Sequence, residues 1–167
     1  MKALGLVLPL LMLASGCASY SWRPSVPQEF RTVAVPVFRN GGDVTELGAV
    51  VARQTLREFQ REGTYSVASL DDAALEVQGE IKNAGSKTVA YERRTGARSR
   101  ERRFTATAVV SFIDKRSGRI LVDNRRYAAE TTFLVNDDVL TGERDASGRL
   151  AEDIARQIVD DAVGLKW

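Results

Sequence analysis

The sequence contains no histidine, the residue that most often serves as a general base and as a metal ligand in proteins. Its single cysteine, Cys17, cannot form an intramolecular disulfide. No serine lies in a nucleophile-elbow pattern, and no glycine-rich phosphate loop is present. Adjacent carboxylates such as Asp71 and Asp72 diverge on a helix or turn and are usually solvated. We therefore expect a protein that is not an enzyme and that needs no metal and no cofactor.

Long apolar runs are also absent, except before Cys17. Lys2 is the only charged residue there, Leu4–Ala14 is apolar, and small residues occupy positions 14–16. A charged start, a short apolar core and a small-residue cleavage site predict a secretory signal peptide over residues 1–16. The apolar segment is shorter than the about 20 residues that a membrane-spanning helix needs.

The small residues before Cys17 resemble a bacterial lipobox, in which Leu and two small residues precede the cysteine. Ala14 stands where Leu is usual, with Leu13 one place further out. An ordinary signal peptide with an incidental cysteine is the alternative. Lipid on Cys17 would anchor the protein, because each buried methylene contributes about 0.8 kcal/mol. Gram-negative lipoproteins with Asp after the cysteine stay in the inner membrane, so Ala18 implies the outer membrane, with the domain facing the periplasm.

The chain after the signal peptide has the size of one domain. Pro24 and Pro27 favour an extended tether, which we expect over residues 17–29. Residues 30–167 are expected to form a single periplasmic domain without a membrane-spanning segment. The net charge of this basic protein is only +2, so the local distribution of charge is more informative than the total.

Periodicity predicts the elements of the domain. Val33, Val35 and Val37 alternate as in a strand, whereas Leu150 and Ile154 are spaced as on one face of a helix. The predicted strands are 30–38, 65–69, 73–81, 87–94, 102–114 and 119–132; the predicted helices are 43–62 and 148–163, and 135–147 is a predicted polar loop. This order predicts an α+β fold: a two-layer sandwich with two helices packed on one face of a four-stranded, mostly antiparallel sheet.

Three local signals refine these boundaries. Asp43 with Glu46 is similar to a capping box at the start of the first helix. Gly63 is expected to end that helix. Pro36 suggests an edge or a bulge near the end of the first strand, because proline cannot donate a ladder hydrogen bond.

A short segment from Glu92 to Arg103 is rich in arginine. Its six arginines are Arg93, Arg94, Arg98, Arg100, Arg102 and Arg103. Several guanidinium groups together can bind phosphates in a planar, two-pronged way, whereas the simpler interpretation is a solvated hairpin tip. The abundant phosphate-bearing partner in the periplasm is lipopolysaccharide, and the secretion signal argues against nucleic acid. The segment is therefore a candidate anion site.

Motifs along the mature chain resemble the lipopolysaccharide-assembly lipoprotein family LptE. They begin with the lipobox followed by Tyr20, and continue with the strand Arg31–Asn40 and the helix after it. The segment Asp72–Ile81, the run Val109–Phe112, Ser117 with Gly118, and the closing helix with Ile154 and Ile158 complete the pattern. The order and spacing of these segments carry the resemblance, since no single motif is specific.

The resemblance implies an outer-membrane lipoprotein that sits as a plug inside the β-barrel LptD. It implies roles in assembling that barrel and in delivering lipopolysaccharide to the outer leaflet. The fold implied by the family is the same two-helix, four-strand sandwich. An alternative family of regulatory lipoproteins activates a cell-wall synthase or belongs to a secretion assembly, and the run Val35–Asn40 suits it nearly as well.

Overall fold

The computed structural model describes residues 26–41, 46–94, 97–135 and 139–167, and it describes no side chains for residues 90–100 and 139–140. The signal peptide, Cys17 and Asp43 lie outside the described residues. The elements follow one another as η2 (Gln28–Phe30), β1 (Thr32–Ala34), β2 (Arg39–Asn40), α2 (Leu47–Glu62), β3 (Ser66–Val67), β4 (Leu75–Arg94), β5 (Ala97–Asp114), β6 (Arg119–Val135) and α3 (Val139–Val163). No helix among these residues is long and apolar enough to cross a membrane.

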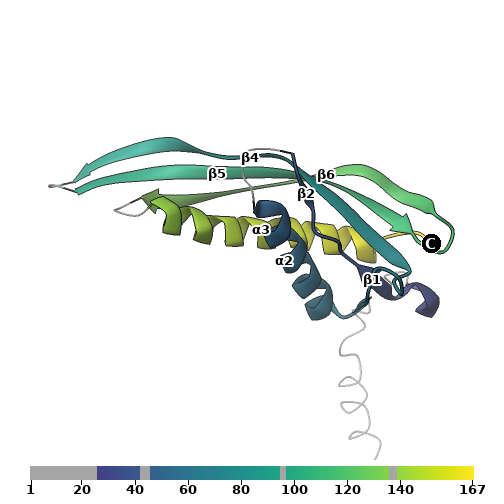
Figure 1. Cartoon of the computed structure of the whole chain (residues 1–167). Helices are drawn as coiled ribbons and strands as arrows, with labels where there is room; N and C mark the ends of the chain where they lie inside the picture. The colour runs from purple at the N-terminus through teal and green to yellow at the C-terminus, as the bar shows by residue number, and fades with distance from the viewer. Residues whose placement is uncertain (1–25, 42–45, 95–96, 136–138) are drawn as a thin grey trace, which may run out of the picture.

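The strands form one mixed sheet, and both helices lie against one of its faces (Figure 1). The sheet order is β3-β1-β4-β5-β6, and β2 pairs with β4 beyond the end of β1. The short strands β1, β2 and β3 make parallel pairs, whereas the long strands β4, β5 and β6 are antiparallel. The predicted α+β class is confirmed. The predicted count of four strands in the sheet was too low, because the short segment predicted at 65–69 joins the sheet as β3 and the two-residue strand β2 adds a sixth strand.

The core forms between α3 and the long strands. Every second side chain of β5, from Phe104 to Phe112, is buried, as alternation along a strand requires when one face is covered. On α3, Leu150, Ile154 and Ile158 are fully buried at the predicted helical spacing. α2 packs chiefly on α3 rather than on the sheet. The covered face of β4–β6 therefore points to α3, and the opposite face is left open.

The predicted loop over 135–147 was wrong: β6 continues to Val135 and α3 already begins at Val139. Ala146 is fully buried four residues before Leu150, so the apolar stripe of α3 starts earlier than its bulky residues indicate. Gly142 lies within the first turns of this helix. Its role is steric, because a Cβ there would lie 2.8 Å from the Phe133 ring.

Other boundaries also shift. The predicted strands 73–81 and 87–94 are one strand, β4, whose pairing with β5 is irregular on either side of Lys82 and of Val89. Of the predicted strand 30–38, only β1 is a strand; the chain leaves the ladder around Pro36 and pairs again only at β2, beyond the predicted end. Gly63 ends α2 as predicted, with a left-handed φ of 84°. The capping group at the start of α2 is Asn40, whose Oδ1 accepts a hydrogen bond from the Gly48 N–H at 2.8 Å.

The outer edge of the sheet is β6, and side chains of α3 reach over it. Gln157 donates to the Ala128 carbonyl at 3.2 Å, and Arg149 donates to the Thr132 carbonyl at 3.3 Å. Exposed carbonyls on an edge strand can pair with another chain, so these bonds occupy acceptors that would otherwise be open.

Phe38 fixes the segment between β1 and β2 onto the sheet. It is 1% exposed and lies over Gly79 of β4, where a Cβ would come within 2.4 Å of the Phe38 ring. The glycine in the strand thus makes room for the aromatic ring.

Replacing Gly79 by alanine is expected to lower the free energy of unfolding by about 2 kcal/mol, because the Phe38 ring must move out of its site. Urea denaturation measures the change. Gly85→Ala is the matched control in the same strand, since no atom lies within 4 Å of a Cβ there. Adding Phe38→Leu to Gly79→Ala should recover part of the loss, and purely additive effects would contradict this packing.

Two buried tyrosines tie α3 to the rest of the domain. The Tyr65 hydroxyl donates to the Ala162 carbonyl at 2.8 Å, and the Tyr127 hydroxyl donates to Asp161 Oδ2 at 2.7 Å. Arg125 pairs with the same Asp161 at 2.9 Å. Burial raises the pKa of Tyr65 to about 12, and burial together with the Asp161 carboxylate raises the pKa of Tyr127 as well.

The pKa of a tyrosine in the unfolded chain is about 10, and the pKa of these tyrosines is higher in the folded protein. Each therefore contributes its full stabilisation of the fold below about pH 10. That contribution is lost as the pH rises through the pKa of the folded state. We expect the guanidinium midpoint to fall between pH 10 and pH 12. Tyr65→Phe should cost about 1 kcal/mol at neutral pH through the lost hydrogen bond. It should also make the alkaline decline shallower, and an unchanged slope would contradict the assignment.

Candidate interaction surface on the open sheet face and the hairpin

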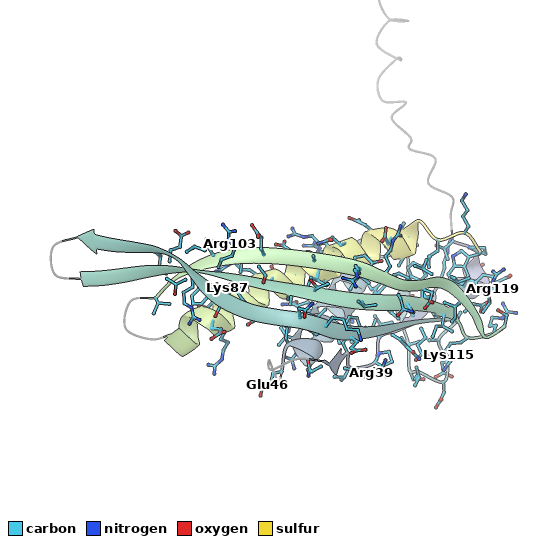
Figure 2. The ribbon with its side chains drawn as sticks, turned by 90° about the horizontal axis from the view of Figure 1, so that it is seen from above. Arg39, Glu46, Lys87, Arg103, Lys115 and Arg119 are labelled. Atoms are coloured by element: carbon cyan, nitrogen blue, oxygen red, sulfur yellow. The ribbon has the colours of Figure 1, made fainter. Side chains whose placement is uncertain are left out.

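The face of the sheet opposite the helices is polar. Alternation along β4 places Glu76, Gln78 and Glu80 on this face, and along β5 it places Arg103 and Thr105 there. Figure 2 views the molecule from above, with these strands running from the turn that carries Lys115 to the hairpin. Within the described residues no second layer covers the long strands on this side.

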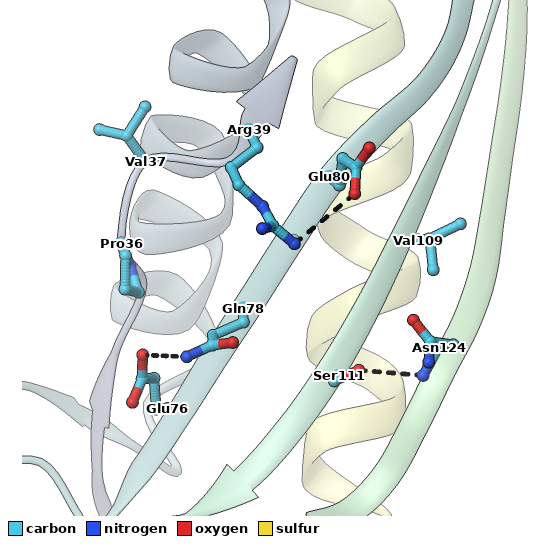
Figure 3. A pocket seen from close by; sticks show the side chains of 10 residues that line it. Pro36, Val37, Arg39, Glu76, Gln78, Glu80, Val109, Ser111 and Asn124 are labelled. Carbon is cyan, nitrogen blue, oxygen red and sulfur yellow. Dashed lines mark hydrogen bonds and ion pairs between the residues drawn. The ribbon is translucent and has the colours of Figure 1, made fainter. Parts of the chain in front are cut away.

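A hollow of about 310 Å³ lies on this face between the β1–β2 segment and the strands β4 to β6 (Figure 3). Val37, 70% exposed, stands at its rim. Glu80 accepts a hydrogen bond from Lys82 at 2.7 Å and pairs with Arg39 at 3.6 Å, and the Lys82 hydrogen bond lowers the pKa of Glu80. Gln78 donates to Glu76 at 2.8 Å. Glu76 also lies 4.0 Å from Lys115 Nζ. Because a cation stands beside each carboxylate, the hollow offers polar contacts rather than a pair of carboxyl groups poised for acid–base catalysis.

An irregularity in β6 shapes the far wall of the hollow. Asn124 has a positive φ of 49°, where pairing with β5 shifts between Val110 and Phe112. The Asn124 N–H donates to Ser111 Oγ at 2.9 Å (Figure 3). The Ser111 hydroxyl in turn donates to Asp123 at 3.2 Å. Asn tolerates the left-handed region better than most residues. This bulge was not predicted, although an Asp–Asn pair inside a strand pattern could have indicated it.

The hairpin of β4 and β5 stays paired up to Arg94 and Ala97, beyond the last residue of β6. Lys87 faces Arg103 directly across these two strands, and both are exposed. Figure 2 labels the pair where the hairpin leaves the helix-covered body. No salt bridge joins either side chain to a carboxylate within the described part of the chain. Like charges directly opposite each other are unfavourable in a sheet, and a bound anion would relieve the repulsion.

Arg102 lies on the other face of the sheet from Arg103. It is partly buried, is paired in register with the buried Phe133, and donates to the Ser86 carbonyl at 3.3 Å. Its Nε is buried without a hydrogen-bond partner among the described residues. Two of the six predicted arginines are therefore separated by the sheet itself. Alternation in a strand was a sufficient signal for this separation.

The other four arginines of the candidate site lie in the outer part of the hairpin. Arg93 pairs in register with Arg98, and Arg100 pairs with Tyr91. Their side chains are outside the described residues. Lys87, which sequence reasoning did not select, joins the site through its register with Arg103.

Solved structures with the same fold include several bacterial proteins of low sequence identity. A protein from Xanthomonas campestris aligns with a TM-score of 0.56 and 10% identity over 86% of this chain and 88% of its own. A protein from Chlamydia trachomatis aligns with a TM-score of 0.51 and 14% identity over 80% of this chain and 95% of its own. A protein from Caulobacter crescentus described as a lipoprotein aligns with a TM-score of 0.50 and 14% identity over 76% of this chain and 88% of its own. These similarities show the fold alone. Comparison with curated proteins finds no relative of this sequence.

The family comparison covers most of the domain. The family described as LptE, lipopolysaccharide-assembly, matches residues 30–162, from the end of η2 to the last turn of α3. That range includes the long strands, both helices and the whole arginine-rich hairpin. The chain belongs to the LptE family of lipopolysaccharide-assembly proteins.

Proposed function

We propose that this protein is an outer-membrane lipoprotein that works with the β-barrel LptD in assembling lipopolysaccharide at the outer membrane. It acts as a plug and chaperone of the barrel and as a lipopolysaccharide-binding component, without catalysing a reaction. The match to the LptE family over residues 30–162 carries this proposal. Lipid on Cys17 holds the protein on the periplasmic face of the membrane.

The open sheet face supports a position against a barrel wall. Large outer-membrane barrels are apolar toward lipid and polar inside. The open face presents carboxylates, amides, hydroxyls and cations rather than a broad apolar patch. Such a face can exchange water for polar contacts with a barrel lumen, whereas the apolar face of the sheet is already occupied by the helices.

The hairpin supports contact with phosphates. Lys87 and Arg103 repel each other in the absence of an anion, and the remaining candidate arginines lie further along the same two strands. The lipid A part of lipopolysaccharide carries phosphates, to which guanidinium groups bind by two parallel hydrogen bonds. We propose Arg93, Arg94, Arg98, Arg100, Arg102 and Arg103 as the lipopolysaccharide-binding set, with Lys87 added.

Replacing Arg98, Arg100 and Arg103 together by glutamine should weaken lipopolysaccharide binding by at least about tenfold, because charge-assisted contacts are lost. Arg102 is kept, since it donates to the Ser86 carbonyl. Titration calorimetry at two salt concentrations measures the affinity and its salt dependence, and both should fall. The matched control replaces Arg53, Arg57 and Arg61, which are exposed on α2. Equal losses in the two triple variants would contradict a hairpin site.

Capture of the lipidated protein in mild detergent is expected to recover a large outer-membrane β-barrel. Cys17→Ser should move the protein into the soluble periplasmic fraction, because the anchor is lost. Membrane fractionation and mass spectrometry measure both results. Failure to recover any barrel would favour the regulatory-lipoprotein alternative, which the run Val35–Asn40 also suits. Depletion of this protein from cells separates the two functions. Loss of surface lipopolysaccharide supports the proposal, and a cell-wall defect with normal lipopolysaccharide supports the alternative.

A further inference from the structure

The end of the sandwich opposite the hairpin carries an aromatic stack beside a cation. Phe30 of η2 and Trp167 stack with ring centroids 4.4 Å apart and an angle of 19° between their planes. The Arg116 guanidinium, in the β5–β6 turn, lies 5.2 Å from the centre of the Phe30 ring. Both rings are partly buried against the hydrophobic core, so the stack supports this end from within and holds Trp167 close to its surface.

Exposed aliphatic side chains gather at the same end. Leu70 is 45% exposed, and its carbonyl accepts a hydrogen bond from Lys115 Nζ at 2.6 Å. Ile120 is 53% exposed and follows Arg119, which is paired with Asp114 next to Lys115. Two large apolar side chains are therefore exposed to water at the end of the sandwich where the β5–β6 turn carries Lys115.

Charges of both signs surround a shallow hollow at this end. The hollow has a volume of about 270 Å³, and its lining includes Glu29, Asp71, Asp72, Lys115 and Arg116. A surface with paired cations and carboxylates has little net charge. It matches a zwitterionic group, whose phosphate would contact Lys115 and Arg116 and whose ammonium would contact the carboxylates.

The length of chain before this end limits its distance from Cys17. Eight residues separate Cys17 from Val26, so the two lie within about 30 Å even when that chain is fully extended. Val26 is held at this end, because its carbonyl accepts a hydrogen bond from Arg31 Nε at 2.9 Å. β4 runs for 20 residues, about 65 Å, from Leu75 to the hairpin. Cys17 therefore lies nearer to this end of the sandwich than to the far end of β4.

We propose that this end, formed by η2, the 68–72 loop, the β5–β6 turn and Trp167, docks on the headgroup layer of the phospholipid leaflet that carries the Cys17 lipid. Leu70 and Ile120 enter the layer of glycerol and headgroups. The hollow beside them takes zwitterionic headgroups of the phosphoethanolamine type. The inference rests on the lipidation of Cys17 in the proposed function and is independent of LptD and of lipopolysaccharide.

The test couples the mature chain, residues 17–167, through Cys17 to maleimide-bearing vesicles of phosphatidylethanolamine and phosphatidylglycerol. Cys17 is the only cysteine, so the attachment point is unique. Trp22→Phe leaves Trp167 as the sole tryptophan. A nitroxide on a fraction of the headgroups quenches only nearby indoles, so quenching of Trp167 reports docking rather than mere tethering.

Leu70→Glu with Ile120→Glu should reduce this quenching at least about twofold, because carboxylates resist entry into the headgroup layer. Leu134→Glu is the control, a 61% exposed position on β6 toward the hairpin, and should leave quenching unchanged. Leu70→Gln with Ile120→Gln repeats the test without added charge, and circular dichroism checks the fold of each variant. Equal quenching in the wild type and in both double variants, or an equal loss in the control, would overturn the proposal.

Headgroup chemistry and salt give two further readouts. Quenching should persist in about 0.5 M sodium chloride, because the contact depends little on net charge. It should weaken when phosphatidylcholine replaces phosphatidylethanolamine, since a quaternary ammonium cannot donate hydrogen bonds, and no change would overturn the headgroup assignment. Because the tether is chemical, a failure here is distinguishable from a failure of natural lipidation, which fractionation of the Cys17→Ser variant measures.

Discussion

Burial of one face of β4–β6 against α3 determines most of what is visible elsewhere in this molecule. Side chains alternate along a strand, so covering the face that carries Phe104 and Phe112 commits their neighbours to the other side. A slip of one residue in the pairing would move the apolar side chains of that strand to the solvent face, so a change of register would cost much of the free energy of burial. The open polar face, the hollow on it and the placing of Arg103 are consequences of this one packing arrangement. The same arrangement leaves Arg102 half-buried beneath the sheet, where its Nη2 has the Ser86 carbonyl as a partner.

Much of this fold could be predicted from the sequence, because its signals are local. Alternation in β5 and the spacing of Leu150, Ile154 and Ile158 fix an element and its buried face without any knowledge of the partner. The first turns of α3 could not be predicted in this way. The buried residue in these turns is Ala146, whose small side chain gives a weak apolar signal. The need for glycine at position 142 comes from the Phe133 ring of β6, which is a contact between two elements. Asn40 as the cap of α2 is likewise a contact from outside the helix.

The candidate site was predictable in composition but not in arrangement. Six arginines in one segment indicate affinity for anions, yet a strand distributes consecutive side chains over two faces, and Arg102 and Arg103 show the result. Lys87 joins Arg103 only through pairing across the hairpin, and the register of that pairing could not be read from the sequence. Charge clustered in sequence therefore becomes two surfaces with different surroundings. One is solvated and repulsive, and the other is partly shielded from water by the helix layer.

The side chains that α3 extends over β6 have a consequence for how this protein can meet another β-protein. A barrel wall is itself made of strands, and a bare edge beside it would invite strand exchange or stacking of copies. Gln157 and Arg149 hold two of the carbonyls along that edge, so an incoming strand would first have to displace both hydrogen bonds. Recognition is thereby left to side chains and surface shape. Along this stretch of β6, pairing with a foreign strand would thus require α3 to give up contacts that also hold it on the sheet.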